Sequence, residues 1–256
     1  MTDSALTVIQ LTDPHLHTDV HATLRGVQTW PSFERVLAHA KSHHWPPDVV
    51  VVTGDLAQDE ASATYVKLAE RMVQLNCPVL FAPGNHDNPD AMHAHLNDGA
   101  LSCAPQHRFG NWQLHLLSTH VPGHVHGSLS DASLEQLRDA LAQDDAPPHS
   151  LLLMHHPAFP VAPKWLNESR LDNADDLLAI SRASHRVRGM VCGHVHLAFE
   201  TTDQGVWMAS TPSTGAQFHP SNATFSLDDR GPGYRVLRLR DDGRIESEVI
   251  WLAPEK

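Results

Sequence analysis

The chain has few of the residues that staple a small protein or anchor it in a membrane. Its 256 residues include three cysteines, Cys77, Cys103 and Cys192, and no CxxC pair, which excludes a disulfide framework and favours a reducing compartment. No apolar run approaches the roughly 20 residues that cross a membrane, and the first ten residues lack the features of a signal peptide. We therefore expect a soluble, cytoplasmic protein with no membrane partner.

Positive charge is also scarce. Lys and Arg total 18 against 30 Asp and Glu, which gives a net charge of -12. Proteins bind nucleic acid largely through basic patches that displace counterions from its phosphates. The excess of acidic residues therefore argues against a nucleic-acid partner and against a nuclease. A small anionic substrate is still compatible, because a bound metal ion reverses the sign of the charge locally.

Histidine is the residue in excess, with 21 copies, more than Lys and Arg together. Neutral imidazole is the commonest metal ligand in proteins, so this count points toward metal chemistry. The length of 256 residues and the 41% hydrophobic content fit a globular chain of one or two domains. Because no linker or repeat interrupts the pattern, we expect a single domain over residues 1–256.

The first third of the chain alternates strand and helix patterns. Leu6–Thr12, Val49–Thr53 and Pro78–Ala82 are strand-like, whereas Pro31–His44 and Glu60–Leu75 carry apolar residues at helical spacing. Val49–Val52 is continuously apolar, as in a strand covered on both faces. This alternation predicts a parallel sheet with helical crossovers.

The remainder of the chain is richer in strands. Gly110-Asn111 and Asp242-Gly243 are hairpin signals between strand-like runs. The expected helices are Ser130–Ala142 and Asp175–Arg182, and the expected strands are Gln113–Ser118, Ser150–Met154, Val187–Cys192, Phe199–Asp203, Val206–Ser210, Tyr234–Arg240 and Ile245–Trp251. Together the two regions predict an α/β fold with mixed sheets.

Potential metal ligands follow five of the expected strands. They are Asp13 with His15, Gly54-Asp55, Gly84-Asn85-His86-Asp87, His155-His156-Pro157 and Gly193-His194-Val195-His196. Ligands of α/β sheets bind beyond the carboxyl ends of the strands. We therefore expect seven side chains to gather there: Asp13, His15, Asp55, Asn85, His155, His194 and His196. Between the adjacent histidines we choose His155, because it comes first off the strand and His156 points to the opposite face if the backbone stays extended.

The ordered motifs resemble those of the calcineurin-like metallophosphoesterase superfamily and, within it, the class III cyclic-nucleotide phosphodiesterases. Four segments outside the metal motifs carry the closer likeness: Leu24–Trp30, Gly54–Asp59, Thr211–Thr214 and Phe225–Tyr234. The resemblance implies two mixed β-sheets packed face to face and flanked by helices. It also implies hydrolysis of 3′,5′-cyclic AMP to 5′-AMP, with a small cyclic nucleotide as the partner.

The resemblance further implies a dinuclear metal centre with Asp55 as the bridging ligand. One ion would be held by Asp13, His15, Asp55 and His196, and the other by Asp55, Asn85, His155 and His194. Oxygen and imidazole donors without thiolate suit iron, manganese or zinc. The family favours iron, alone or paired with manganese, as divalent or trivalent ions.

Two such ions lower the pKa of a shared water and supply a metal-bound hydroxide that attacks phosphorus. The 3′ oxygen of the ribose is a poor leaving group and needs a proton, and His86 is the best-placed donor. The phosphate is expected to touch Asn85 and His86 and to border His15, Asp55 and His196.

Three alternatives stay open at this point. The substrate could be another small phosphodiester, such as a glycerophosphodiester or a 2′,3′-cyclic nucleotide, or the chain could be a non-catalytic metal-dependent module that binds a nucleotide. Asp59 could orient His86, but it fits better as the N-cap of a helix that starts at Glu60. Trp30, Trp45 and Trp165 could stack on a base, although packing roles suit them better.

Overall fold

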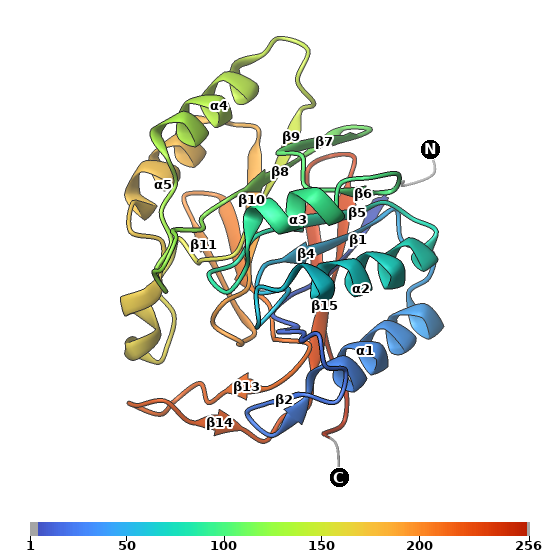
Figure 1. Cartoon of the computed structure of the whole chain (residues 1–256). Helices are drawn as coiled ribbons and strands as arrows, with labels where there is room; N and C mark the ends of the chain where they lie inside the picture. The colour runs from blue at the N-terminus through green and yellow to red at the C-terminus, as the bar shows by residue number, and fades with distance from the viewer. Residues whose placement is uncertain (1–4, 255–256) are drawn as a thin grey trace.

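Two six-stranded sheets packed face to face form the centre of the molecule (Figure 1), and the computed structural model describes residues 5–254. The first sheet has the order β16-β15-β1-β4-β5-β6. Its strands are β1 (Ala5–Leu11), β4 (Val49–Thr53), β5 (Val79–Ala82), β6 (Leu101–Ser102), β15 (Gly233–Arg240) and β16 (Ile245–Trp251). β1, β4, β5 and β6 run parallel to one another. β15 runs antiparallel to both of its neighbours, β1 and β16, so the sheet is mixed.

The second sheet has the order β11-β12-β10-β9-β8-β7. Its strands are β7 (Gln106–Phe109), β8 (Trp112–Leu117), β9 (His149–Met154), β10 (Val187–Cys192), β11 (Phe199–Asp203) and β12 (Val206–Ser210). The four central strands are parallel and the two edge strands are antiparallel. The expected pair of mixed sheets is confirmed, as are both predicted hairpins.

Helices cover the two outer faces (Figure 1). α1 (Thr29–His43), α2 (Ser62–Met72) and α3 (Pro89–His95) belong to the side of the first sheet, and α4 (Asp131–Ala142) and α5 (Ala174–Ala183) cover the second. Short pieces complete the fold: η1 (Val73–Leu75), η2 (Lys164–Ser169) and two small hairpins, β2 (Thr23–Leu24) with β3 (Val27–Gln28) and β13 (Gln217–Phe218) with β14 (Leu227–Asp228).

The apolar residues separate into three layers that follow from strand periodicity. In β4, Val50 and Val52 face α1 and α2, whereas Val49 and Val51 face the second sheet. The continuous valine run is therefore explained by burial on both faces. Among residues 5–254, no helix is long and apolar enough to cross a membrane.

One predicted boundary is wrong for a physical reason. The second helix begins at Ser62, not Glu60, and Ala61 is its N-cap without a side-chain hydrogen bond. Asp59 accepts instead from the backbone N–H groups of Thr18 and Ala61. Its carboxylate joins the chain after β1 to the start of α2, so its role is a tertiary bridge.

Candidate active site

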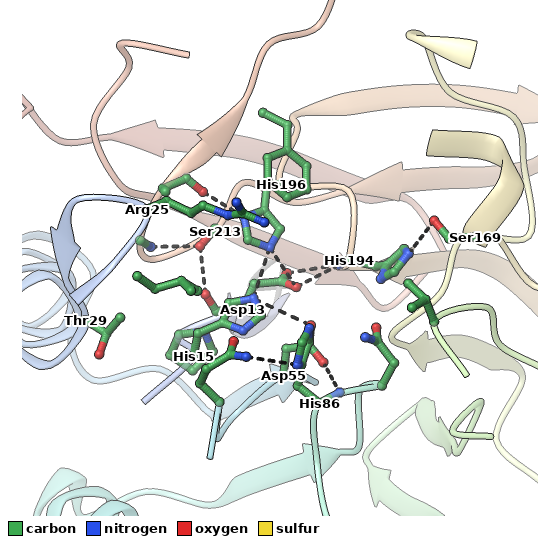
Figure 2. Close-up of a pocket in the computed structure, with 18 of the residues that line it drawn as sticks. Asp13, His15, Arg25, Thr29, Asp55, His86, Ser169, His194, His196 and Ser213 are labelled. Carbon is green, nitrogen blue, oxygen red and sulfur yellow. Dashed lines mark hydrogen bonds and ion pairs between the residues drawn. The ribbon is translucent and has the colours of Figure 1, made fainter. Parts of the chain in front are cut away.

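A pocket of about 250 Å³ opens where the carboxyl ends of both sheets meet (Figure 2). The first sheet delivers Asp13 and His15 after β1, Asp55 after β4, and Asn85 and His86 after β5. The second sheet delivers His155 after β9 and His194 and His196 after β10. All of them line the pocket except His155, which is fully buried beneath it.

The seven expected ligands lie within reach of one another. His15 Nε2 is 3.2 Å from His196 Nε2 and 3.5 Å from an Asp55 oxygen, and His196 Nε2 is 3.3 Å from an Asp13 oxygen. His155 Nε2 faces the other oxygen of Asp55 at 3.4 Å. Figure 2 shows Asp13 in the middle of this cluster, with His15 and His194 on opposite sides.

The remaining two members approach from the second-sheet side. Asn85 Oδ1 lies 3.2 Å from His155 Nε2. A ring nitrogen of His194 lies within 4.8 Å of ring nitrogens of His155 and His156. The carboxylate oxygens of Asp55 thus face His15 on one side and His155 on the other.

The ring orientations make this cluster fit metal ions. His155 Nδ1 lies 2.8 Å from the carbonyl oxygen of Thr53, and His196 Nδ1 lies 2.7 Å from that of Ala216. A carbonyl only accepts, so each Nδ1 donates its N–H and leaves a lone pair on Nε2 when the ring is neutral. Those lone pairs point at carboxylate and amide oxygens that also only accept, and a cation between them resolves the conflict. Metal-binding histidines in general donate their second N–H to such an acceptor.

The electrostatics also favour positive charge at this position. Burial opposes the protonation of His155, but the carboxylates of Asp55 and Asp13 outweigh it and raise the pKa of His155 to about 9. Burial dominates at His15, where it lowers the pKa to about 4 despite the Asp55 carboxylate. The carboxylates therefore stabilise a positive charge within the cluster, while His15 presents a neutral ring near pH 7.

The backbone is bent sharply at the ligands. Five of the seven have left-handed φ values, which cost non-glycine residues free energy and concentrate at functional sites: Asp13 (51°), His15 (46°), Asp55 (52°), His194 (68°) and His196 (46°). Glycines permit the close approach. A Cβ at Gly54 would lie 2.3 Å from His155 Nδ1, and one at Gly193 would lie 1.9 Å from Thr12 Oγ1.

A buried carboxylate holds two of the first-sheet loops together. Asp87 accepts from the backbone N–H groups of Leu56, Ala57 and Gly84 and from the Tyr65 hydroxyl. Burial and the neighbouring Asp55 raise the pKa of Asp87 to about 7, while its backbone donors oppose that rise. Asp87 thus joins the Asp55 loop to the Asn85 loop through hydrogen bonds to backbone N–H groups of both.

His86 lies at the rim of the cluster and differs from the ligands in its partners. Its backbone N–H donates to Asp55 at 2.9 Å, and its Nδ1 lies 3.1 Å from Gln58 Nε2. The ring of His15 also meets the His86 ring edge-on, with centroids 5.2 Å apart, and a ring nitrogen of His86 lies within 4.8 Å of ligand atoms of His15 and Asp55. The side chain that hydrogen-bonds the His86 ring is Gln58, so the alternative considered for Asp59 is wrong. Gln58 directly precedes Asp59, so the sequence indicated the segment but not the side chain.

His156 is as buried as His155 and lies within ligand distance of His155 and His194. Its two ring nitrogens are already engaged, Nδ1 with the Thr119 hydroxyl at 2.7 Å and Nε2 with the carbonyl of Val125 at 3.0 Å. His194 Nε2 lies 2.9 Å from Ser169 Oγ. Nothing in the local sequence indicated Ser169, because η2 reaches the pocket only through the tertiary fold.

Comparison with known proteins defines the class first. The family model for calcineurin-like phosphoesterases matches residues 6–198, and the chain belongs to this family. Solved structures agree on the fold. A dimetal phosphatase from Danio rerio superposes with a TM-score of 0.63 at 16% identity and covers 97% of this chain and 99% of its own. Purple acid phosphatase PPD1 from yellow lupin gives 0.58 at 15% identity over 98% of this chain and 55% of its own.

Curated relatives are similar over almost the whole length. The chain is 40% identical over 253 residues to the 3′,5′-cyclic adenosine monophosphate phosphodiesterase CpdA of Escherichia coli strain K12, covering 98% of this chain and 91% of that protein. It is 35% identical to CpdA of Haemophilus influenzae, covering 94% and 88%. It is 32% identical to the 3′,5′-cyclic-nucleotide phosphodiesterase alr5338 of Nostoc sp. strain PCC 7120, covering 95% and 91%.

Proposed function

We propose that this chain hydrolyses 3′,5′-cyclic AMP to 5′-AMP with the help of two metal ions. The observation that carries the proposal is the cluster of imidazole lone pairs turned toward the carboxylates of Asp13 and Asp55. The CpdA relatives, at 32–40% identity over nearly their full length, are named as 3′,5′-cyclic AMP phosphodiesterases, and this supports the choice of substrate. The net charge of -12 supports a small cyclic nucleotide over nucleic acid as the partner.

The residues that would hold the ions are those expected from the sequence. Asp13, His15, Asp55 and His196 would hold one ion, and Asp55, Asn85, His155 and His194 the other. When bound, two such ions supply a hydroxide nucleophile at neutral pH and neutralise charge on the phosphoryl oxygens. We propose iron, with an iron–manganese pair or zinc also compatible with oxygen and imidazole donors.

The side chains around the ligands would then bind and orient the substrate. The phosphate would contact Asn85 and His86 and border His15, Asp55 and His196, all of which line the pocket. His86 would give a proton to the departing 3′ oxygen. The amide of Gln58, 3.1 Å from His86 Nδ1, supports this role because it leaves Nε2 as the nitrogen free to face the substrate.

A substrate panel tests the proposal directly. Purified protein loaded with iron, manganese or zinc is assayed with 3′,5′-cyclic AMP, 3′,5′-cyclic GMP, 2′,3′-cyclic AMP, bis(p-nitrophenyl) phosphate and p-nitrophenyl phosphate. We expect 3′,5′-cyclic AMP to give the highest kcat/KM. A higher value for 2′,3′-cyclic AMP or for a simple diester would reassign the substrate, and bound metal without any turnover would indicate a binding module.

The product gives a second, independent check. Hydrolysis in oxygen-18 water should yield 5′-AMP with one label on the phosphate. A main product of 3′-AMP would reverse the proposed orientation of the cyclic phosphate. The three cysteines Cys77, Cys103 and Cys192 are free thiols, and on that ground we also propose a cytoplasmic location.

A further inference from the structure

One wall of the active-site pocket consists of aromatic rings and holds none of the candidate metal ligands. Phe218 and Phe225 come from the β13–β14 hairpin, and Trp165 comes from η2. We call these three side chains the aromatic wall. In Figure 1 the β13–β14 hairpin lies at the bottom of the molecule beside β2, outside both large sheets.

The aromatic wall starts at a metal-ligand candidate and extends away from it. The ring of Phe218 is stacked on the imidazole of His196, with centroids 4.3 Å apart and planes at 4°. Phe225 meets Phe218 at 5.4 Å and 74°, and Trp165 meets Phe225 at 5.9 Å and 77°. Trp165 also lies 5.8 Å from Phe218 at 51°, so the three rings contact one another and form an apolar surface of the pocket next to the candidate metal ligands.

Phe225 is held in an exposed position by a cation. Phe225 is 43% exposed, whereas large aromatic residues are usually buried. The guanidinium carbon of Arg25 lies 4.5 Å from the centre of the Phe225 ring. Within residues 5–254, Arg25 is the one lysine or arginine that lines this pocket. Figure 2 shows Arg25 beside His196 and Ser213.

Packing of the hairpin explains only part of this arrangement. Phe218 and Trp165 are half-buried and pack against the apolar layer under α4 and α5, so they also anchor β13 and β14. Phe225 adds little to that anchor, since much of its surface faces solvent. Ligand pockets are typically lined by apolar and aromatic side chains with a few polar groups, and the aromatic wall with Arg25 matches that description.

We infer that the aromatic wall binds the base of the nucleotide whose phosphate lies over the metal ligands, and this inference rests on the proposed function. A base is flat, presents a π-face, and is separated from its phosphate by one sugar. The aromatic wall likewise lines the same pocket as the candidate ligands but extends to one side of them. Stacking on aromatic side chains suits such a group and tolerates different bases. Arg25 is a positioning residue that holds Phe225 in place.

Binding of the product and of its baseless fragment measures this subsite. The dissociation constants of both ligands are determined by calorimetry on the metal-loaded protein, and the Kd of ribose 5-phosphate divided by the Kd of 5′-AMP reports the contribution of the base. Phe225→Leu keeps apolar volume but removes the π-face, and we expect it to lower the ratio roughly five- to 150-fold. Phe225→Tyr should restore the ratio.

Trp251 provides the matched control, because Arg230 lies over its ring at 4.6 Å and it does not line the pocket. Trp251→Leu should leave the ratio unchanged. A ratio equal to that of the unmodified protein in Phe225→Leu would overturn the inference, as would an equal drop in Trp251→Leu. If the base raises affinity through Phe225 but cyclic AMP is not hydrolysed, the proposed function fails alone and the subsite stands.

Discussion

The two sheets contribute different chemistry to one pocket. The first sheet supplies the two ligand carboxylates, Asp13 and Asp55, whereas the second supplies three imidazoles, His155, His194 and His196. The first sheet therefore carries negative charge that would attract cations, and the second carries imidazole nitrogens that would complete the proposed coordination. Neither sheet has all of the proposed ligands, so the proposed metal site exists only where the two sheets meet.

The loops of the two sheets are also secured in different ways. In the first sheet, the Asp87 carboxylate ties the Asp55 and Asn85 loops through backbone N–H groups. In the second sheet, the backbone N–H of Gly193 donates to the carbonyl of His155 at 3.1 Å, and His194 Nε2 contacts Ser169 Oγ at 2.9 Å. Loss of the Asp87 carboxylate should therefore loosen the Asp55 and Asn85 loops together, while the histidine loops keep their own hydrogen bonds.

The largest expected effect comes from removing Asp55, whose carboxylate lies between His15 of the first sheet and His155 of the second. Asp55→Ala should lose most bound metal and nearly all phosphodiesterase activity while the fold survives, because both proposed ions share Asp55. His194→Ala is the second-sheet counterpart and should lose one metal equivalent. Elemental analysis of both purified variants measures this, and two full equivalents in Asp55→Ala would rule out the bridge.

Next in size is the loss of the proposed proton donor. His86→Ala leaves all seven ligand candidates in place, so metal content should not change, while kcat for cyclic AMP should fall roughly 10²–10⁴-fold. The loss should be smaller for bis(p-nitrophenyl) phosphate, whose leaving group needs no proton. The measurement is kcat for both substrates at matched metal occupancy. Equal losses of kcat on both substrates would argue against proton donation by His86, and a loss of bound metal would mean that His86 is a ligand or supports one.

Loss of Asp87, which joins the Asp55 and Asn85 loops, should lower the stability of the fold more than it changes the catalytic groups. Asp87→Ala leaves three backbone N–H groups and the Tyr65 hydroxyl without their acceptor, and we expect the free energy of unfolding to fall by about 3 kcal/mol. Tyr65→Phe removes one of these bonds and should cost about 1 kcal/mol. Hydrogen exchange should show faster opening around Asp55 and Asn85 than around His194; equal loss of protection around His194 would mean that the loops of the two sheets open together.

An effect confined to acidic pH and absent near pH 7 is expected in the second sheet, away from the active-site pocket. Burial lowers the pKa of His115 to about 4, so the folded protein holds this ring neutral while the unfolded chain binds a proton at higher pH. Its stabilising contribution is complete above pH 6.5 and is lost as the pH falls toward 4, by about 2–3 kcal/mol. Denaturant unfolding of His115→Gln at pH 7 and pH 4 should show a correspondingly weaker pH dependence.

An exposed histidine supplies the control for that measurement. His21 lies at the surface of the loop between β1 and β2, so His21→Gln should keep the pH dependence of the unmodified protein. The same pH dependence in His115→Gln as in His21→Gln would mean that His115 is protonated as easily in the folded protein as in the unfolded chain.

Much of the fold could be predicted from local patterns. The continuous run Val49–Val52 predicts a strand buried on both faces, and the structure places its alternate valines in two apolar layers. Asp13 and Asp55 follow neighbouring parallel strands of the first sheet, so their arrival at one edge follows from parallel pairing. The small hairpin β13–β14 was not predicted, because two-residue strands carry no measurable periodicity.

The sequence by itself determined the strands, the ligand types and the order in which they arrive, because these depend on residues close along the chain. Only the tertiary structure decided which atoms meet. Gln58, not its neighbour Asp59, contacts His86, and Arg25 lies over Phe225, 200 residues away in the sequence. Such contacts depend on how sheets and hairpins pack across the pocket, and local periodicity holds no information about that packing.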